Sequence, residues 1–183
     1  LPTDRIRPAV ASFAGDTASF ALPRKLATKL VELARREEVT LYMVLLAAYQ
    51  LLLKRYSGQD DIVVGSPIAG RSRPELQQLI GYFVNMLAMR TDLAGDPPFS
   101  ELLKRVKDVA LGAYSHQDLP FEKLVEELQP VRDLSRQPVF QVLFALQPSM
   151  VPVNAFAGLQ LTRYEEIKAS SKYDLSLYLT AID

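Results

Sequence analysis

Four short segments hold most of the residues in this chain that could bind or position a reacting group. Asn85, in the second segment, carries a side-chain amide that can donate to a carbonyl oxygen or orient an amine. The alternative is that Asn85 satisfies backbone groups at a bend in a strand. The four segments are 65–71 (GSPIAGR), 80–90 (IGYFVNMLAMR), 116–122 (HQDLPFE) and 132–140 (RDLSRQPVF).

The composition excludes several common kinds of chemistry. The chain has no cysteine, which removes disulfides, thiolate catalysis and cysteine-based metal sites. His116 is its single histidine, so two histidines cannot share a metal and we expect no metal site. The sequence has no Gly-Lys-Ser/Thr phosphate-binding loop and no G-x-S-x-G turn around a nucleophilic serine. A Ser-His-Asp triad can be drawn with His116, but the spacing does not support it.

Charge and hydropathy narrow the class of partner. The chain has 183 residues, enough for one domain, and its 21 basic residues balance 21 acidic ones. A net charge of zero argues against a nucleic-acid partner. The apolar stretch 41–53 is shorter than the about 20 residues that span a membrane. The first residues do not have the pattern of a signal peptide, so we expect a cytoplasmic protein without a membrane partner. The first residue, Leu1, is not methionine and the last residues resemble a strand, so we expect a piece of a longer protein.

Proline, glycine and apolar spacing predict the elements of the first half. Residues 1–15 have the composition of a linker or an extended segment leading into the domain. A helix opens after Pro23, with leucines on one face. A second helix, apolar nearly all round, runs from an N-cap at Thr40 to a stop at Gly58. Strands are expected at 62–65 and 80–89, with a loop at 65–74.

The second half predicts two more helices and three strands. Helical spacing predicts a helix over 99–114 and a shorter one from Pro120 to Pro130. We interpret the apolar stripe of the shorter helix (Phe121, Leu124 and Leu128) as part of the core. Strands are expected at 139–146, 159–164 and 173–179, the last with clean alternation. The fold class is therefore α/β or α+β, a mixed sheet with helices packed on it.

The last three of the four segments resemble, in order and spacing, the fifth, sixth and seventh core motifs of condensation domains from nonribosomal peptide synthetases. The family patterns are roughly I/V-G-x-F-V-N-T, H/N-Q-D-x-P-F-E and R-D-x-S-R-N-P-L. The opening Leu-Pro-Thr-Asp-Arg and the run at 60–65 also look like the family, so the resemblance covers essentially the whole chain. Met86 stands where Thr is usual and Gln137 where Asn is frequent, which we interpret as tolerated changes.

This resemblance implies a fold like that of chloramphenicol acetyltransferase, with two lobes arranged as a V around a tunnel. Two carrier proteins deliver thioester substrates on phosphopantetheine arms, and the acceptor amine attacks the donor thioester. The family's active-site motif, H-H-x-x-x-D-G, belongs to the N-terminal lobe and is absent from a chain with one histidine. We therefore expect residues 1–183 to be the C-terminal lobe, inactive in condensation alone and binding no cofactor directly.

The resemblance also implies roles for individual residues. Asn85 and Gly81 are expected to support the substrate tunnel. Arg71 is expected to pair with the aspartate of the active-site motif in the other lobe, with Arg90 as a rival. The family accepts Asn in place of His116, so we interpret His116 as a capping or hydrogen-bonding residue at the start of the helix after Pro120.

Structural roles are expected for the remaining motif residues. Asp118 and Pro120 belong to the turn before the short helix. A local charge and turn network before Val139 is expected from Arg132, Asp133, Ser135 and Arg136.

The partners implied are peptidyl or acyl carrier proteins, the N-terminal lobe and a neighbouring adenylation domain. An isolated lobe exposes apolar surface, so we also expect self-association through that face. Two other functions stay open, a non-catalytic module that binds a carrier or neighbouring domain and a lobe of a related CoA-dependent acyltransferase. Epimerization domains fit less well because 142–146 does not resemble their F-N-Y-L-G pattern, and heterocyclization domains differ around Asn85.

Overall fold

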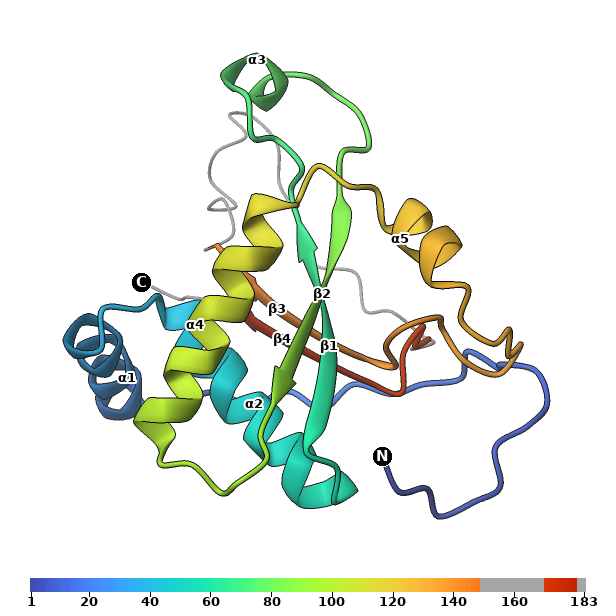
Figure 1. The fold of residues 1–183 in the computed structure, drawn as a ribbon, viewed down its shortest axis with the longest axis horizontal. Helices are drawn as coiled ribbons and strands as arrows, with labels where there is room; N and C mark the ends of the chain where they lie inside the picture. The colour runs from blue at the N-terminus through green and yellow to red at the C-terminus, as the bar shows by residue number, and fades with distance from the viewer. Residues whose placement is uncertain (149–169, 181–183) are drawn as a thin grey trace, which may run out of the picture.

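The computed structural model describes residues 1–148 and 170–180 of the chain. These residues form a sheet with helices packed on it (Figure 1). The elements are α1 (Arg24–Arg36), α2 (Leu41–Ser57), β1 (Asp61–Ile68), α3 (Pro74–Gln77), β2 (Asn85–Asp92), α4 (Phe99–Ser115), α5 (Phe121–Leu128), β3 (Val142–Gln147) and β4 (Leu175–Thr180).

The sheet has four strands in the order β2-β1-β3-β4. β2 runs antiparallel to β1, with Asp61 opposite Asp92 at one end and Ile68 opposite Asn85 at the other. β3 is parallel to β1, which it meets where Gly65 lies opposite Leu143, and β4 is parallel to β3. The mixed sheet confirms the predicted fold class.

One face of the sheet carries the main core. α2 and α4 pack on this face, and α1 packs on α2 (Figure 1). Side chains alternate along the strands, so every second residue of each strand points to this layer. The fully buried side chains of the core include Val44, Leu46, Val64, Met89, Leu103, Val106 and Phe144.

Local signals at the ends of α2 act as the sequence predicts. The Thr40 hydroxyl accepts a hydrogen bond from the Met43 amide at 3.2 Å, which satisfies an N–H that has no partner within the helix. Gly58 ends the helix in the left-handed conformation, with φ at 69°. The helix after Pro23 and the helix over 99–114 are also confirmed, as α1 and α4.

Three predicted strands begin later than expected, and the smallest difference is at β4, which starts at Leu175 instead of Tyr173. β2 starts at Asn85 instead of Ile80, because the chain from 69 to 84 forms a loop around α3. Gly70 makes this loop feasible, since its φ is 63° and a Cβ there would lie 1.8 Å from the Phe83 carbonyl oxygen. β3 starts at Val142, because Val139 has a φ of 68° and interrupts the extended backbone. The strand predicted at 159–164 lies outside the described residues.

The short helix α5 lies apart from α1, α2 and α4, across β1 and β2 from them (Figure 1). Its first residue, Phe121, packs on Phe140 with 5.2 Å between ring centroids. The prediction that its apolar stripe belongs to the core is wrong, because α5 has no buried residue and Leu128 is 59% exposed. Helical spacing shows that one face is apolar but not what covers that face.

Residues 1–15 form an irregular segment that is hydrogen-bonded to two distant loops. The Ala11 amide donates to the Leu134 carbonyl at 3.0 Å, and the Ser171 amide donates to the Phe13 carbonyl at 2.9 Å. The lead-in segment is therefore part of the folded unit in this structure. Within the described residues, none of the helices combines the length and apolar character needed to cross a membrane.

Candidate functional site

Asn85 lies at the first position of β2, where its side chain joins three parts of the chain. Its Nδ2 donates to the carbonyl oxygens of Gln117 at 2.9 Å and Leu119 at 2.8 Å. Its Oδ1 accepts from the backbone amides of Met86 at 2.9 Å and Phe121 at 3.0 Å. The side chain thus connects β2 to the turn between α4 and α5 and to the first residue of α5.

The turn between α4 and α5 carries the other residues of the third segment. His116 is the C-cap of α4, and its Nδ1 lies 2.9 Å from the Gly112 carbonyl oxygen, to which a protonated Nδ1 donates. This places the imidazole at the end of α4, and not at the start of α5 as the sequence predicts. Asp118 is exposed on the turn, and Pro120 is the N-cap residue of α5.

Arg71 is engaged within the loop that precedes β2. Its Nη1 donates to the Leu76 carbonyl and its Nη2 to the Gly81 carbonyl at 3.3 Å. Its guanidinium also lies over the Phe83 ring, 4.3 Å from the centroid. In this structure Arg71 therefore holds the loop from 76 to 83 in one shape, and Gly81 takes part through its backbone.

Arg90 lies on the outer surface of the sheet, paired with Asp61 on β1. Its Nε and Nη2 donate to the two carboxylate oxygens at 3.0 and 2.7 Å. These hydrogen bonds from Arg90 hold the pKa of Asp61 below its ordinary value. Arg90 and Asn85 are an odd number of positions apart on β2, so alternation along the strand places the two side chains on opposite faces.

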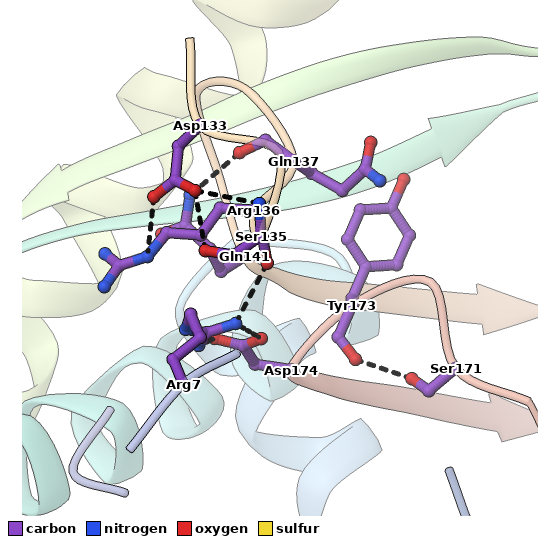
Figure 2. Close-up of polar contacts among 9 residues, drawn as sticks. All are labelled: Arg7, Asp133, Ser135, Arg136, Gln137, Gln141, Ser171, Tyr173 and Asp174. Atoms are coloured by element: carbon purple, nitrogen blue, oxygen red, sulfur yellow. Dashed lines mark hydrogen bonds and ion pairs between the residues drawn. The ribbon is translucent and has the colours of Figure 1, made fainter. Parts of the chain in front are cut away.

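The fourth segment forms a polar network that includes two residues the sequence did not single out (Figure 2). Asp133 accepts hydrogen bonds from the Ser135 amide at 2.8 Å and the Ser135 hydroxyl at 2.6 Å, and it lies 3.5 Å from Arg136. The pKa of Asp133 is lowered chiefly by the hydrogen bond from the Ser135 hydroxyl and next by the one from the Ser135 amide. The positive charges of Arg136 and Arg7 lower it further. The remaining residue of the predicted set, Arg132, is exposed.

The two unforeseen residues of this network are Arg7 and Asp174. Arg7 donates to both carboxylate oxygens of Asp174 and, at 3.2 Å, to the Ser135 carbonyl. Asp174 lies just before β4, where its amide donates to the Gln141 carbonyl at 2.8 Å. No local pattern marks either residue, because their contact depends on how segments distant in sequence come together.

Phe140 lies between the contacts of Asn85 and the polar network around Asp133 and Asp174. Its ring packs on Phe121, next to the Asn85 contacts, and stacks on Tyr173 with 5.8 Å between centroids. The ring fills the space above Gly65 on β1, where an added Cβ would lie 2.1 Å from Phe140 Cε2. This aromatic row connects α5 to the start of β4 across the face of the sheet opposite α2.

A separate set of polar contacts, made by Tyr42 and Ser66, lies between α2 and the sheet. The Tyr42 hydroxyl donates to Ser66 Oγ at 2.8 Å, and Ser66 donates to the Phe144 carbonyl at 3.0 Å. Burial raises the pKa of Tyr42 far above its ordinary value. The phenol therefore stays neutral and serves to satisfy buried polar groups.

Two hollows of the described chain lie away from Asn85. One of about 370 Å³ opens between the α1–α2 turn and α4, lined by residues that include Glu37, Lys104 and Lys107. Another of about 50 Å³ lies beside the Asp133 network and is too small for an aminoacyl group. Among the described residues, no group of three His, Cys, Asp or Glu is arranged to hold a metal ion.

The comparisons with known proteins agree with one another. A family model described as "Condensation domain" matches residues 1–183. A linear gramicidin synthase polypeptide of Brevibacillus parabrevis is 55% identical over 179 residues, which is 97% of this chain and 2% of the relative. Tyrocidine synthase 3 of the same organism is 48% identical over 177 residues, which is 97% of this chain and 3% of the relative. The chain thus spans a very small part of the length of the curated relatives it matches.

Solved structures show the same likeness. An X-domain, solved in the complex of the X-domain and OxyB from teicoplanin biosynthesis, is 31% identical, with a TM-score of 0.88. The match covers 98% of this chain and 39% of that one. The four-domain nonribosomal peptide synthetase holo-AB3403, bound to AMP and glycine, is 30% identical with a TM-score of 0.78, over 80% of this chain and 11% of that one.

Proposed function

Because this chain belongs to the condensation-domain family of nonribosomal peptide synthetases, we propose that it is the C-terminal lobe of a domain that forms amide bonds between carrier-bound substrates. The donor and acceptor groups arrive as thioesters on the phosphopantetheine arms of peptidyl or acyl carrier proteins. An adenylation domain of the same cytoplasmic synthetase would be a neighbour.

The observation that carries this proposal is the likeness to peptide synthetases, together with the contacts that Asn85 and His116 make within the chain. Asn85 already makes four hydrogen bonds within the chain, and His116 caps α4. Asn85 is not a base, and the His116 imidazole lies at the end of α4, where its Nδ1 contacts the Gly112 carbonyl. In this proposal the group that handles the proton of the attacking amine belongs to a separate lobe with an H-H-x-x-x-D-G motif.

The role proposed for this chain is to build one wall of the substrate tunnel. The loop from 76 to 83 and the turn from 116 to 120 meet at the start of β2, where Arg71 and Asn85 fix their shapes. A wall of fixed shape can hold the donor thioester and the acceptor amine in reacting geometry. Pairing of Arg71 with the aspartate of the other lobe would require one of its present contacts to be exchanged.

A binding module without catalysis is the second candidate. The observation that favours it is the high likeness to an X-domain whose solved structure is a complex with OxyB. A module of this kind would present a surface to a carrier protein or to another domain. It would need no histidine of its own.

The test compares this chain alone with the same chain joined to the segment that precedes it in its parent protein. Each is mixed with loaded donor and acceptor carrier proteins, and the dipeptidyl product is measured by mass spectrometry. We expect product only from the longer protein. Product from this chain alone would contradict the proposal, and carrier binding without product from the longer protein would favour the binding module. Replacing the donor carrier with an acyl-CoA distinguishes the CoA-dependent alternative.

A further inference from the structure

The start of α5 depends on a residue that lies 36 positions earlier in the chain. The first N–H groups of a helix have no acceptor within the helix, and a side chain at the N-cap position usually supplies one. The N-cap residue of α5 is Pro120, whose side chain cannot accept a hydrogen bond. From β2, Asn85 Oδ1 supplies an acceptor to the first amide of the helix by accepting from Phe121 at 3.0 Å.

The amide of Asn85 is also fully used. An asparagine side chain offers two N–H donors and two lone pairs on its oxygen. Here both donors go to the carbonyls of Gln117 and Leu119, and the oxygen accepts from Met86 and Phe121. A substrate carbonyl or amine could bind this amide only if one of these bonds were broken.

We propose that Asn85 is a positioning residue, which locks the 116–120 turn and α5 onto β2 and does not touch the substrate. The proposal rests on the function proposed above, since what Asn85 positions is a wall of the tunnel. The residue type follows from the contacts. Aspartate would set a negative oxygen against the two carbonyls, and alanine would leave all four backbone groups without this partner.

The lock itself is tested in this chain by amide hydrogen exchange measured by NMR. The amide of the first residue of a helix normally exchanges quickly, but Phe121 should be protected because Asn85 supplies its acceptor. In Asn85→Ala, we expect exchange at Phe121 to be faster by roughly fivefold or more, the size that loss of a cap implies. Equal exchange rates at Phe121 in the two proteins would overturn the proposal.

The second arm asks whether the lock is what the reaction needs, in the longer protein that carries both lobes. Asn85→Ala should lower kcat for amide formation and leave the KM for carrier proteins nearly unchanged, because the four contacts of Asn85 all lie within the chain. Adding Pro120→Ser gives α5 a cap of its own, since serine at the N-cap accepts from the second or third amide of the helix. The double variant should recover part of kcat, whereas the matched control Asn85→Ala with Pro120→Ala should not.

The outcomes separate the two proposals. If Asn85 bound the substrate directly, Pro120→Ser would restore amide protection within α5 without restoring kcat, and the positioning role would be refuted. If the wild-type protein with both lobes formed no amide while Phe121 stayed protected, the proposed function would fail and the structural lock would stand.

Discussion

Arg7 and Asp174, which are 167 positions apart, meet in a two-point contact between guanidinium and carboxylate. The contact fastens the lead-in segment to the start of β4, and Arg7 also donates to the Ser135 carbonyl in the turn from 133 to 136 (Figure 2). The two side chains are 24% and 27% exposed, so water screens the pair only in part. The pKa of Arg7 is raised first by the hydrogen bonds that it donates to Asp174 and then by the negative charge of that carboxylate.

Removal of this contact should destabilise the chain. We expect Arg7→Ala to lower the free energy of unfolding by about 1–2 kcal/mol, since charge-assisted paired hydrogen bonds are lost in a partly exposed place. Arg7→Lys is the matched control, because it keeps the charge but not the fork, and should lose less. Urea unfolding at neutral pH measures both. An Arg7→Ala variant as stable as the wild type would show that the contacts of Arg7 contribute nothing to the free energy of unfolding.

The Asp133 turn should make stability depend on pH in the acidic range. Its pKa in the folded chain lies below the ordinary value of 3.8, chiefly because Ser135 donates to the carboxylate. A depressed pKa gives stability that is fully present above the unfolded pKa and is lost as pH falls through the folded pKa. The wild type should therefore exceed Asp133→Asn in stability above about pH 5, by a margin that shrinks below about pH 4. Unfolding curves collected at several pH values test this, and a margin that grows on acidification would contradict it.

Gly65 should tolerate no side chain while Phe140 stays in place. A Cβ at Gly65 would lie 2.1 Å from Phe140 Cε2, so Gly65→Ala must displace the ring that joins Phe121 to Tyr173. We expect a loss of about 2–3 kcal/mol, as for other overpacked sites.

The matched control for this variant is Gly112→Ala on α4. A Cβ at Gly112 meets no atom within 4 Å, and alanine favours the helix, so we expect a gain of about 0.5–1 kcal/mol. Thermal or urea unfolding compares the pair. Similar effects from the two substitutions would mean that Phe140 does not lie against β1.

Local rules are enough to predict several elements of this fold. Thr40, Gly58 and Pro23 act through atoms within four residues of themselves, so their types predict where α1 and α2 begin or end. The mixed sheet follows from finding apolar strand patterns between helical ones. These predictions need no knowledge of which segments meet.

The site is harder to predict, because its contacts join distant segments. Asn85 can be selected by its type, but its partners in the turn and α5 lie 32 to 36 residues away. Arg71 is expected to reach out of the lobe, yet its donors are used by carbonyls 5 and 10 residues along its own loop. Arg7 and Asp174 have no local signal at all. Residue type indicates what a side chain can do, and only tertiary contacts determine what it has left to offer.

The loop before β2 should cause this chain to associate with itself when it is studied alone. Ile80 and Tyr82 are 104% and 88% exposed, on a loop that Arg71 holds in shape through two carbonyls and the Phe83 ring. Because contacts of Arg71 already hold the backbone of this loop, little conformational entropy is lost when its apolar side chains are covered by a second copy of the chain.

We expect light scattering to show a mass above that of the 20.5 kDa monomer, increasing with concentration. Ile80→Ser with Tyr82→Ser should shift the chain to monomer, whereas Tyr56→Ser, at a 68% exposed position at the end of α2, should not. A wild-type chain that stays monomeric at high concentration would refute this prediction, and so would an equal effect of the Tyr56 control.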